Sequence, residues 1–323
     1  MPIGMTPIKT DLSEYKMLWK GLPKCGKTKT AAQFPDGIFL FTEEGASDLS
    51  LPHWMPKGWN PQEQGTYVFK NTSDYDEAIL ELSDMPLGKR PKTAILDTID
   101  GAYDVKAFEL MAGSQVESIN EGKDLGYGKG LERVKNWLQK IVTDFEGLNM
   151  GVIFISHLLE DEIKREGKDP TTVWRDTLPK RVRPMIHGLV DFIWDFRIEG
   201  KQRWIYTQGD ITIEAGSRIT LPYRIPMGGN PQEAYQNILT SFYGRNGDKD
   251  KAKSEIINLV LKGETYLSDK KIDGFEVEKR KINSRELHVL FPDLAKASIE
   301  DLEKYLQHLR LKAKSGQKET ANA

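Results

Sequence analysis

The first half of the chain alternates short apolar runs with segments of helical periodicity. Four runs have the composition of buried strands, at residues 15–19, 38–41, 93–96 and 152–155. Each is followed by polar residues or glycine, and helix-like segments separate them. This alternation is typical of βαβ units that build a mostly parallel sheet. Open sheets of this kind bind ligands at the carboxyl ends of their strands, so the pattern predicts a site there.

The helical segments of this half show where they begin and which face they bury. Residues 27–34 are predicted to be helical, and Ser73 or Asp74 is predicted to cap a second helix. A third helix is indicated by an apolar stripe of Leu131, Val134, Leu138, Ile141, Val142 and Phe145.

The second half has a different pattern, which predicts antiparallel strands. Residues 189–196 alternate apolar and polar side chains, and shorter runs at 203–207, 211–214 and 219–221 predict hairpins. Asn230-Pro231 predicts the start of a helix that Gly244 ends. The resulting domain prediction is a core at residues 1–243, a linker at 244–251, a helical C-terminal domain at 252–314 and a disordered tail at 315–323.

Composition narrows the class of protein. The 323 residues include 46 Lys and Arg against 48 Asp and Glu, so any nucleic-acid contact needs a local basic patch. The sequence has no 18-residue apolar run, which argues against a membrane partner. The lone cysteine, Cys25, excludes a disulfide framework and fits a reducing, cytoplasmic location.

The strongest motif is a phosphate-binding loop. Residues 21–28, Gly-Leu-Pro-Lys-Cys-Gly-Lys-Thr, match the pattern GxxxxGK[ST] between a predicted strand and a predicted helix. Lys27 is predicted to reach the β and γ phosphates of ATP, and Thr28 to bind Mg²⁺. Cys25 is expected to pack rather than react. The predicted nucleotide-binding residues are Gly21, Pro23, Lys24, Cys25, Gly26, Lys27, Thr28 and Lys29.

Three further strand ends carry polar side chains that fit an ATPase. Asp97 stands where the second carboxylate of a P-loop magnesium site is expected, and Asp100 is interpreted as a turn residue. Glu43 is predicted to orient or deprotonate the attacking water, with a solvated acidic turn at Glu43 and Glu44 as the alternative. His157 is predicted to hydrogen-bond the γ phosphate.

Five segments together resemble a known superfamily: GLPKCGKT, FLFTEEGASDL, TAILDTID, LGYGKGLERVKNWLQKI and GVIFISH. They resemble RecA-like proteins, and most closely the phage nucleotide-binding ATPases that act as short RecA-like recombinases in single-strand annealing. The resemblance covers roughly residues 14–225. It implies an α/β RecA-like P-loop core with a mostly parallel twisted sheet, antiparallel hairpins and a small helical C-terminal appendage.

The resemblance also implies roles for single residues. It favours Glu43 as the catalytic carboxylate and His157 as the γ-phosphate sensor. The family's Lys-x-Arg is replaced here by Gly216-Ser217-Arg218, which keeps the arginine and lacks the lysine. Arg218 as a finger into a neighbouring subunit's nucleotide requires a homo-oligomer, a ring or a filament. A phage-encoded chain would act in the cytoplasm of the bacterial host cell.

Two polar stretches are predicted to contact single-stranded DNA. Residues 101–129 contain Lys123, Tyr127 and Lys129, and residues 158–188 are rich in cations. Both are expected to lack regular structure, and long loops in a compact domain are usually functional. Cations track phosphates and an aromatic ring can stack on bases. The predicted DNA-binding residues are Lys164, Arg165, Trp174, Arg175, Lys180, Arg181 and Arg183. A solvated lid is the alternative, because acidic residues dilute the charge.

The predicted function is an ATP hydrolase that depends on single-stranded DNA, in phage-type recombination, repair or replication. The alternative is a P-loop ATPase that acts as a protein-partner switch or helicase loader, with DNA contacted only by a partner. A single-strand-binding or other replication protein would then be that partner. A small-molecule kinase is a weaker option, because the sequence has no compact Arg-rich lid segment.

Overall fold

The computed structural model describes residues 9, 11–45, 51–163, 171–210, 212–244, 260, 302, 305, 306 and 309. The chain divides into two compact units, Met1–Ile238 and Leu239–Ala323. The predicted linker, helical C-terminal domain and tail lie outside the described residues, apart from Gly244 and the five single positions from 260 onward. The site described below belongs to the first unit.

A central sheet carries the strand ends that the sequence singled out. Its parallel part has the order β2-β3-β4-β1-β6. These strands are β1 (Lys16–Gly21), β2 (Gly37–Phe41), β3 (Thr93–Asp97), β4 (Gly151–Ile163) and β6 (Phe192–Glu199). Antiparallel strands complete the sheet: β5 (Thr171–Asp176) on β4, β7 (Gln202–Tyr206) and β8 (Gly216–Ser217) on β6, and β9 (Arg224–Pro226) on β7.

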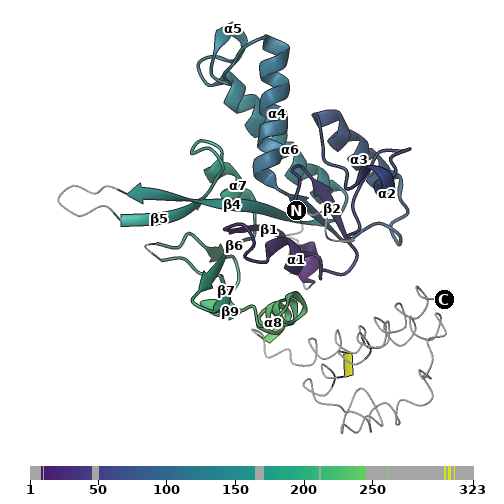
Figure 1. The fold of residues 1–323 in the computed structure, drawn as a ribbon, viewed down its shortest axis with the longest axis vertical. Helices are drawn as coiled ribbons and strands as arrows, with labels where there is room; N and C mark the ends of the chain where they lie inside the picture. Colours follow the sequence, from purple (N-terminus) through teal and green to yellow (C-terminus); the bar gives the residue numbers. More distant parts are fainter. Residues whose placement is uncertain are drawn as a thin grey trace, which may run out of the picture. The chain divides into compact units, whose positions relative to one another are not determined.

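The inner strands are buried on both faces, which explains their continuous apolar sequences. All five positions of β3 are buried, and so are residues 17–21 of β1. The helices are α1 (Lys27–Ala31), α2 (Pro61–Gln64), α3 (Thr72–Asp84), α4 (Ile99–Ser114), α5 (Gly122–Leu125), α6 (Lys129–Gly147), α7 (Arg183–Leu189) and α8 (Pro231–Gly244). Figure 1 shows α4 projecting from the sheet with α5 at its far end and α6 beside it.

The strand order matches the predicted RecA-like core. β1, which leads into the phosphate loop, lies between β4 and β6, and β4 separates it from β3, which ends at Asp97. The predicted α/β fold class, a mostly parallel sheet with antiparallel additions, is therefore confirmed. None of the helices in the described part of the chain has the length and apolar character that crossing a membrane requires.

The expectation that residues 101–129 and 158–188 lack regular structure is wrong for the described residues in both stretches. Residues 101–129 form most of α4, all of α5 and the start of α6. Of the second stretch, residues 158–163 and 171–176 form the antiparallel β4–β5 pair, which extends away from the sheet in Figure 1, and residues 183–188 form most of α7. α4 buries only Ile99, Ala102 and Ala107, so it has no apolar stripe to reveal it. The β4–β5 pair is regular because main-chain hydrogen bonds join polar strands.

Three local predictions are also corrected. Asn71 caps α3, rather than Ser73 or Asp74, and exchanges hydrogen bonds with Asp74 in a capping box. The strand expected at 189–196 begins only at Phe192, since α7 continues to Leu189. Strands expected at 211–214 and 219–221 are absent from the described residues there, and β8 and β9 lie nearby instead. Near the second of these segments, the Gln208 side chain donates to the Leu221 carbonyl and the Thr207 hydroxyl donates to the Pro222 carbonyl.

Candidate nucleotide site

The phosphate loop requires glycine at two positions, at the end of β1 for lack of space and just before α1 for a positive φ. A Cβ atom on Gly21 would lie 2.7 Å from both the Cys25 Sγ and the Phe196 carbonyl oxygen. Gly26 has a φ of 109° and directly precedes α1. The Cys25 side chain is buried beneath the loop, and this burial raises the pKa of its thiol. The loop therefore keeps the tight path of a phosphate cradle, with Cys25 as packing.

Lys27 is folded back into this loop. Its Nζ donates to the carbonyl oxygens of Gly21, at 2.6 Å, and Leu22, at 3.1 Å. The side chain is buried, so the loop holds a positive charge against neutral acceptors. Phosphate oxygens carry charge and make stronger partners for an ammonium group than carbonyls do. By contrast, the predicted contacts Pro23, Lys24 and Lys29 are exposed.

Thr28 and Asp97 meet at the start of α1 and the end of β3. The Thr28 Oγ1 donates to the Asp97 Oδ2 at 2.7 Å. Asp97 is buried, which raises the pKa of its carboxyl group, while the Thr28 hydrogen bond opposes that shift. A hydroxyl and a carboxylate are hard oxygen donors of the kind Mg²⁺ prefers, usually with waters and substrate phosphates as its other ligands. This donor set fits a magnesium ion bound with a nucleotide.

Glu43 and His157 form a second pair, Glu43 from the segment after β2 and His157 from within β4. The expectation that the fourth strand ends before His157 is wrong, because β4 continues to Ile163. The His157 Nε2 lies 2.9 Å from the Glu43 Oε1. A carboxylate can only accept, so Nε2 is the donor. The pKa of Glu43 is lowered, chiefly by the His157 hydrogen bond, and the same bond raises the pKa of His157. The Nδ1 of His157 is buried and has no partner among the described residues.

Thr42, Thr98 and Gly101 connect the segments that follow β2 and β3. The sequence analysis did not identify these three residues. The Thr42 Oγ1 donates to the Thr98 carbonyl at 2.5 Å and accepts from the Thr98 N–H at 2.9 Å. A Cβ on Gly101 would lie 2.5 Å from the Thr42 Oγ1. Glu43 therefore follows a residue that is tied to the segment after Asp97. The peptide bond between Asp97 and Thr98 is cis.

The prediction that Asp100 lies in a loop turn is wrong. Asp100 belongs to the first helical turn of α4. It lies just beyond the end of β3, beside the middle of β4, and accepts hydrogen bonds from Ser156 and His157. No sequence motif marks this role, because it depends on which strands become neighbours.

Arg218 directly follows β8. Its Nη1 lies 3.1 Å from the Asp191 Oδ1, and its Nη2 donates to the Gly188 carbonyl at 3.0 Å. The side chain is 59% exposed, so these contacts leave part of the guanidinium open to solvent. Its predicted role toward a neighbouring subunit stays a prediction.

The structure describes five of the seven predicted DNA-binding residues, and these five differ in exposure and in their partners. Lys164 and Arg165 lie outside the described residues. Trp174 is half-buried in β5, and Arg175 pairs with Asp161 at 3.2 Å. Arg183 lies 3.1 Å from the buried carboxylate of Asp176 and also binds two carbonyls, so it acts within the fold. Lys180 and Arg181 are exposed.

One further cluster has ligand atoms close enough for a metal. Asp176, His187 and Glu214 bring one such atom each within 4.8 Å of one another. Asp176 is already paired with Arg183, and Glu214 lies 3.3 Å from the buried ammonium of Lys20. Because these cations already neutralise the carboxylates, we assign no metal there.

Most of the first unit matches a known protein family. Residues 13–219 match the AAA domain family, a span that includes Lys27, Asp97, His157 and Arg218. None of the curated proteins compared matches the chain. Among solved structures, the crystal structure of a KaiC-like protein from Pyrococcus horikoshii OT3 is similar, with 16% identity and a TM-score of 0.37 over 68% of this chain and 88% of that one. The family match spans more than half of the chain and contains its phosphate loop, so the chain belongs to the AAA domain family and is a P-loop ATPase of RecA-like fold.

Proposed function

We propose that the chain hydrolyses ATP with Mg²⁺ and that single-stranded DNA stimulates this hydrolysis, as in a short RecA-like recombinase or annealing protein of phage type. The observation that carries the proposal is the meeting of two pairs, Thr28 with Asp97 and Glu43 with His157, beside the phosphate loop. The first pair suits a metal-bound triphosphate, and the second suits activation of water.

The residues divide the work between binding and proton transfer. When bound, Mg²⁺ would neutralise charge on the phosphates, held by Thr28 and Asp97. Lys27 exchanges the Gly21 and Leu22 carbonyls for phosphate oxygens. Glu43 stays ionised because His157 lowers its pKa, so its carboxylate can orient a water and take its proton. His157, which is hydrogen-bonded to Glu43, would then sense whether a γ phosphate is bound.

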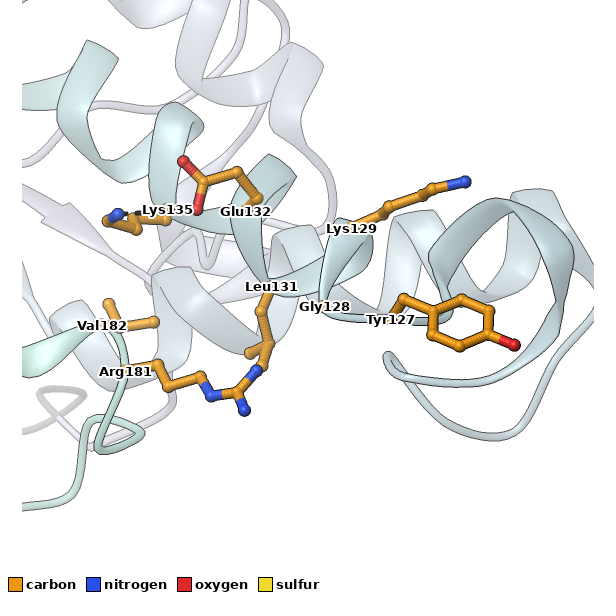
Figure 2. Close-up of a pocket in the computed structure, with 8 residues that line it drawn as sticks. All are labelled: Tyr127, Gly128, Lys129, Leu131, Glu132, Lys135, Arg181 and Val182. Carbon is orange, nitrogen blue, oxygen red and sulfur yellow. Dashed lines mark hydrogen bonds and ion pairs between the residues drawn. The ribbon is translucent and has the colours of Figure 1, made fainter.

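The best-supported DNA surface differs from the one predicted from sequence. An open cavity of about 470 Å³ is lined by Tyr127, Gly128, Lys129, Leu131, Glu132, Lys135, Arg181 and Val182. Figure 2 shows the Tyr127 ring pointing away from α6, and the Arg181 side chain extending toward Leu131. The cavity shares no residue with the phosphate loop. It brings together residues of both stretches that the sequence associated with DNA, namely 127–129 of the first and 181–182 of the second.

The chemistry of this cavity fits a single strand. Tyr127 is fully exposed, between two glycines and with a φ of 56°, so nothing in the fold explains its ring. Lys129, Lys135 and Arg181 line the same cavity and give it positive charge, against one carboxylate from Glu132. An exposed ring offers a stacking platform for bases, and cations bind the phosphates between them.

A short path joins this surface to the ATP site. The Thr177 N–H donates to the His157 carbonyl at 3.1 Å. Arg181 lies four residues after Thr177, in the segment that leads into α7. A shift of His157 on loss of the γ phosphate would therefore be passed to Arg181. DNA that binds one of the two positions better shifts the population between them.

We expect Tyr127→Ala and Arg181→Ala each to weaken binding of an oligothymidine by about tenfold, because each removes a stacking or a phosphate contact. Fluorescence anisotropy across a salt series measures this, and Arg181→Ala should also reduce the salt dependence by about one ion. Phe108→Ala removes another exposed aromatic ring outside the cavity and serves as the control. If wild type binds no DNA even at low salt, the protein-partner alternative is favoured instead.

The proposed homo-oligomer has a separate test. We expect Lys27→Ala and Arg218→Ala proteins to be inactive alone and to regain part of the ATPase activity when mixed, because a mixed interface pairs an intact loop with an intact finger. Hydrolysis at a constant total concentration measures the recovery. Strictly additive, near-zero rates would assign Arg218 to its own chain, where it already binds Asp191.

A further inference from the structure

The carboxylate of Asp100 lies where β3 ends and β4 continues. The last pair between these strands is Asp97 with Ile155, so no β3 residue lies beside Ser156 or His157. Asp100 fills this position. Its Oδ2 accepts from the His157 backbone N–H at 2.8 Å, and its Oδ1 accepts from the Ser156 Oγ at 2.9 Å.

Hydrogen bonds also fix the backbone on the N-terminal side of Asp100. Thr98 caps α4 by accepting from the Gly101 N–H at 3.1 Å, and Thr42 binds both main-chain groups of Thr98. A carboxylate in the first turn of a helix is stabilised by the free N–H groups there. Burial raises the pKa of Asp100, and hydrogen bonding to the Thr177 side chain, the His157 N–H and the Ser156 hydroxyl acts in the opposite direction.

His157 is consequently fixed at three points. Its N–H is bound by Asp100, its carbonyl accepts from the Thr177 N–H, and its ring donates to Glu43. The Asp100 contact is the one that links the His157 backbone to α4. Loss of this contact would let this part of β4 shift, and the 2.9 Å distance between His157 and Glu43 would change with it.

We propose that Asp100 is a positioning residue that sets the hydrogen bond between His157 and Glu43. It touches neither nucleotide nor water and acts through the His157 backbone. The inference rests on the proposed function only for its effect on hydrolysis. Its structural part, the control of the His157–Glu43 contact, holds for the protein without ligand.

The first test uses the full chain without nucleotide and compares two substitutions. Asp100→Asn removes the charge but keeps an oxygen that can accept from the His157 N–H. Asp100→Ala removes both. The charged groups that act on the His157 ring are Glu43, Lys27 and Asp100 itself, so both variants lose the same charge, and only the difference between them reports positioning.

NMR titration of the five histidine rings measures that difference, with His157→Gln to assign the signal. Glu43 raises the pKa of His157, so a loosened contact lowers it. We expect the pKa to fall in the order wild type, Asp100→Asn, Asp100→Ala, with the alanine variant approaching Glu43→Gln. Equal values for the asparagine and alanine variants would show that Asp100 acts by charge alone and would overturn the proposal.

The second test is steady-state hydrolysis. Asp100→Ala should lower kcat on the order of tenfold, a loss typical of a misplaced group, with KM for MgATP within about twofold of wild type. Asp100→Asn should recover part of kcat. Asp84→Asn, the same change at an exposed position of α3, should behave as wild type. Unchanged kcat in Asp100→Ala contradicts the proposal.

Ser156→Ala covers the case in which the Asp100 variants do not fold. It deletes one of the two contacts and should produce a smaller change of the same sign in both the His157 pKa and kcat. No change in either measurement would also count against Asp100. If wild type hydrolyses no ATP, the proposed function fails, while the titration still decides whether Asp100 positions His157.

Discussion

Glu43→Gln is expected to lower kcat for ATP by at least about a hundredfold, the usual range for loss of a general base. Glutamine keeps the size of the side chain and cannot take a proton. The phosphate loop, Thr28 and Asp97 remain intact, because Glu43 has its hydrogen bond to His157 and none to them. The affinity for MgATP should therefore stay within a few fold of wild type.

Single-turnover hydrolysis together with a fluorescent-nucleotide titration separates these two effects. The matched control is Glu44→Gln, which makes the same change at the next, exposed residue and should leave kcat nearly unaltered. Should the two variants lose activity equally, or should only Glu44→Gln lose it, the assignment of the base would have to move.

The pH dependence provides a further check on the same residue. The base works as a carboxylate, so kcat falls as the pH drops through its pKa. Because His157 lowers the pKa of Glu43, the acid limb should lie below the range of an ordinary glutamate. His157→Gln raises that pKa toward its usual value and should move the acid limb to higher pH.

The second large effect is expected for Lys27→Ala, which should abolish both hydrolysis and tight binding of MgATP. Lys27 is a buried cation inside the loop, and alanine leaves the Gly21 and Leu22 carbonyls facing the phosphates without it. A ligand at a hundred times its Kd stabilises a fold by about 2.7 kcal/mol. MgATP should thus raise the Tm of wild type clearly and that of Lys27→Ala hardly at all.

Lys24→Ala is the control for charge, because Lys24 is an exposed cation of the same loop. We expect it to keep most of the thermal shift and of the activity. A Lys27→Ala protein that still gains stability from MgATP would place the triphosphate elsewhere.

The parallel sheet could be predicted from sequence because its strands are buried on both faces. Each of the four predicted runs overlaps a strand, and the polar residues after them meet at one edge as expected. α6 could also be predicted, because its apolar stripe from Val134 to Phe145 is buried. α4 and the β4–β5 pair could not, because their regularity comes from main-chain hydrogen bonds rather than from an apolar pattern.

The residues of the site also fall into a group that the sequence could predict and a group that it could not. Their proximity could be predicted for five residues that belong to a motif or directly follow an apolar run in the sequence: Lys27, Thr28, Glu43, Asp97 and His157. Asp100 and Thr42 act through contacts between residues about 56 positions apart, Asp100 with Ser156 and Thr42 with Thr98. Spacing along the chain cannot reveal such pairs. The cavity at Tyr127 likewise exists only because Arg181 is brought to the start of α6.

The placement of Cys25 has a practical consequence for spectroscopy. It is the chain's single cysteine, and its thiol is both covered and poorly ionised. Maleimide dyes react with exposed thiolates, so the natural protein should label very little. A cysteine introduced on the surface, for example near the end of α5, would carry a fluorophore at a known position without prior removal of the native thiol. Conformational changes on nucleotide addition could then be followed in single molecules.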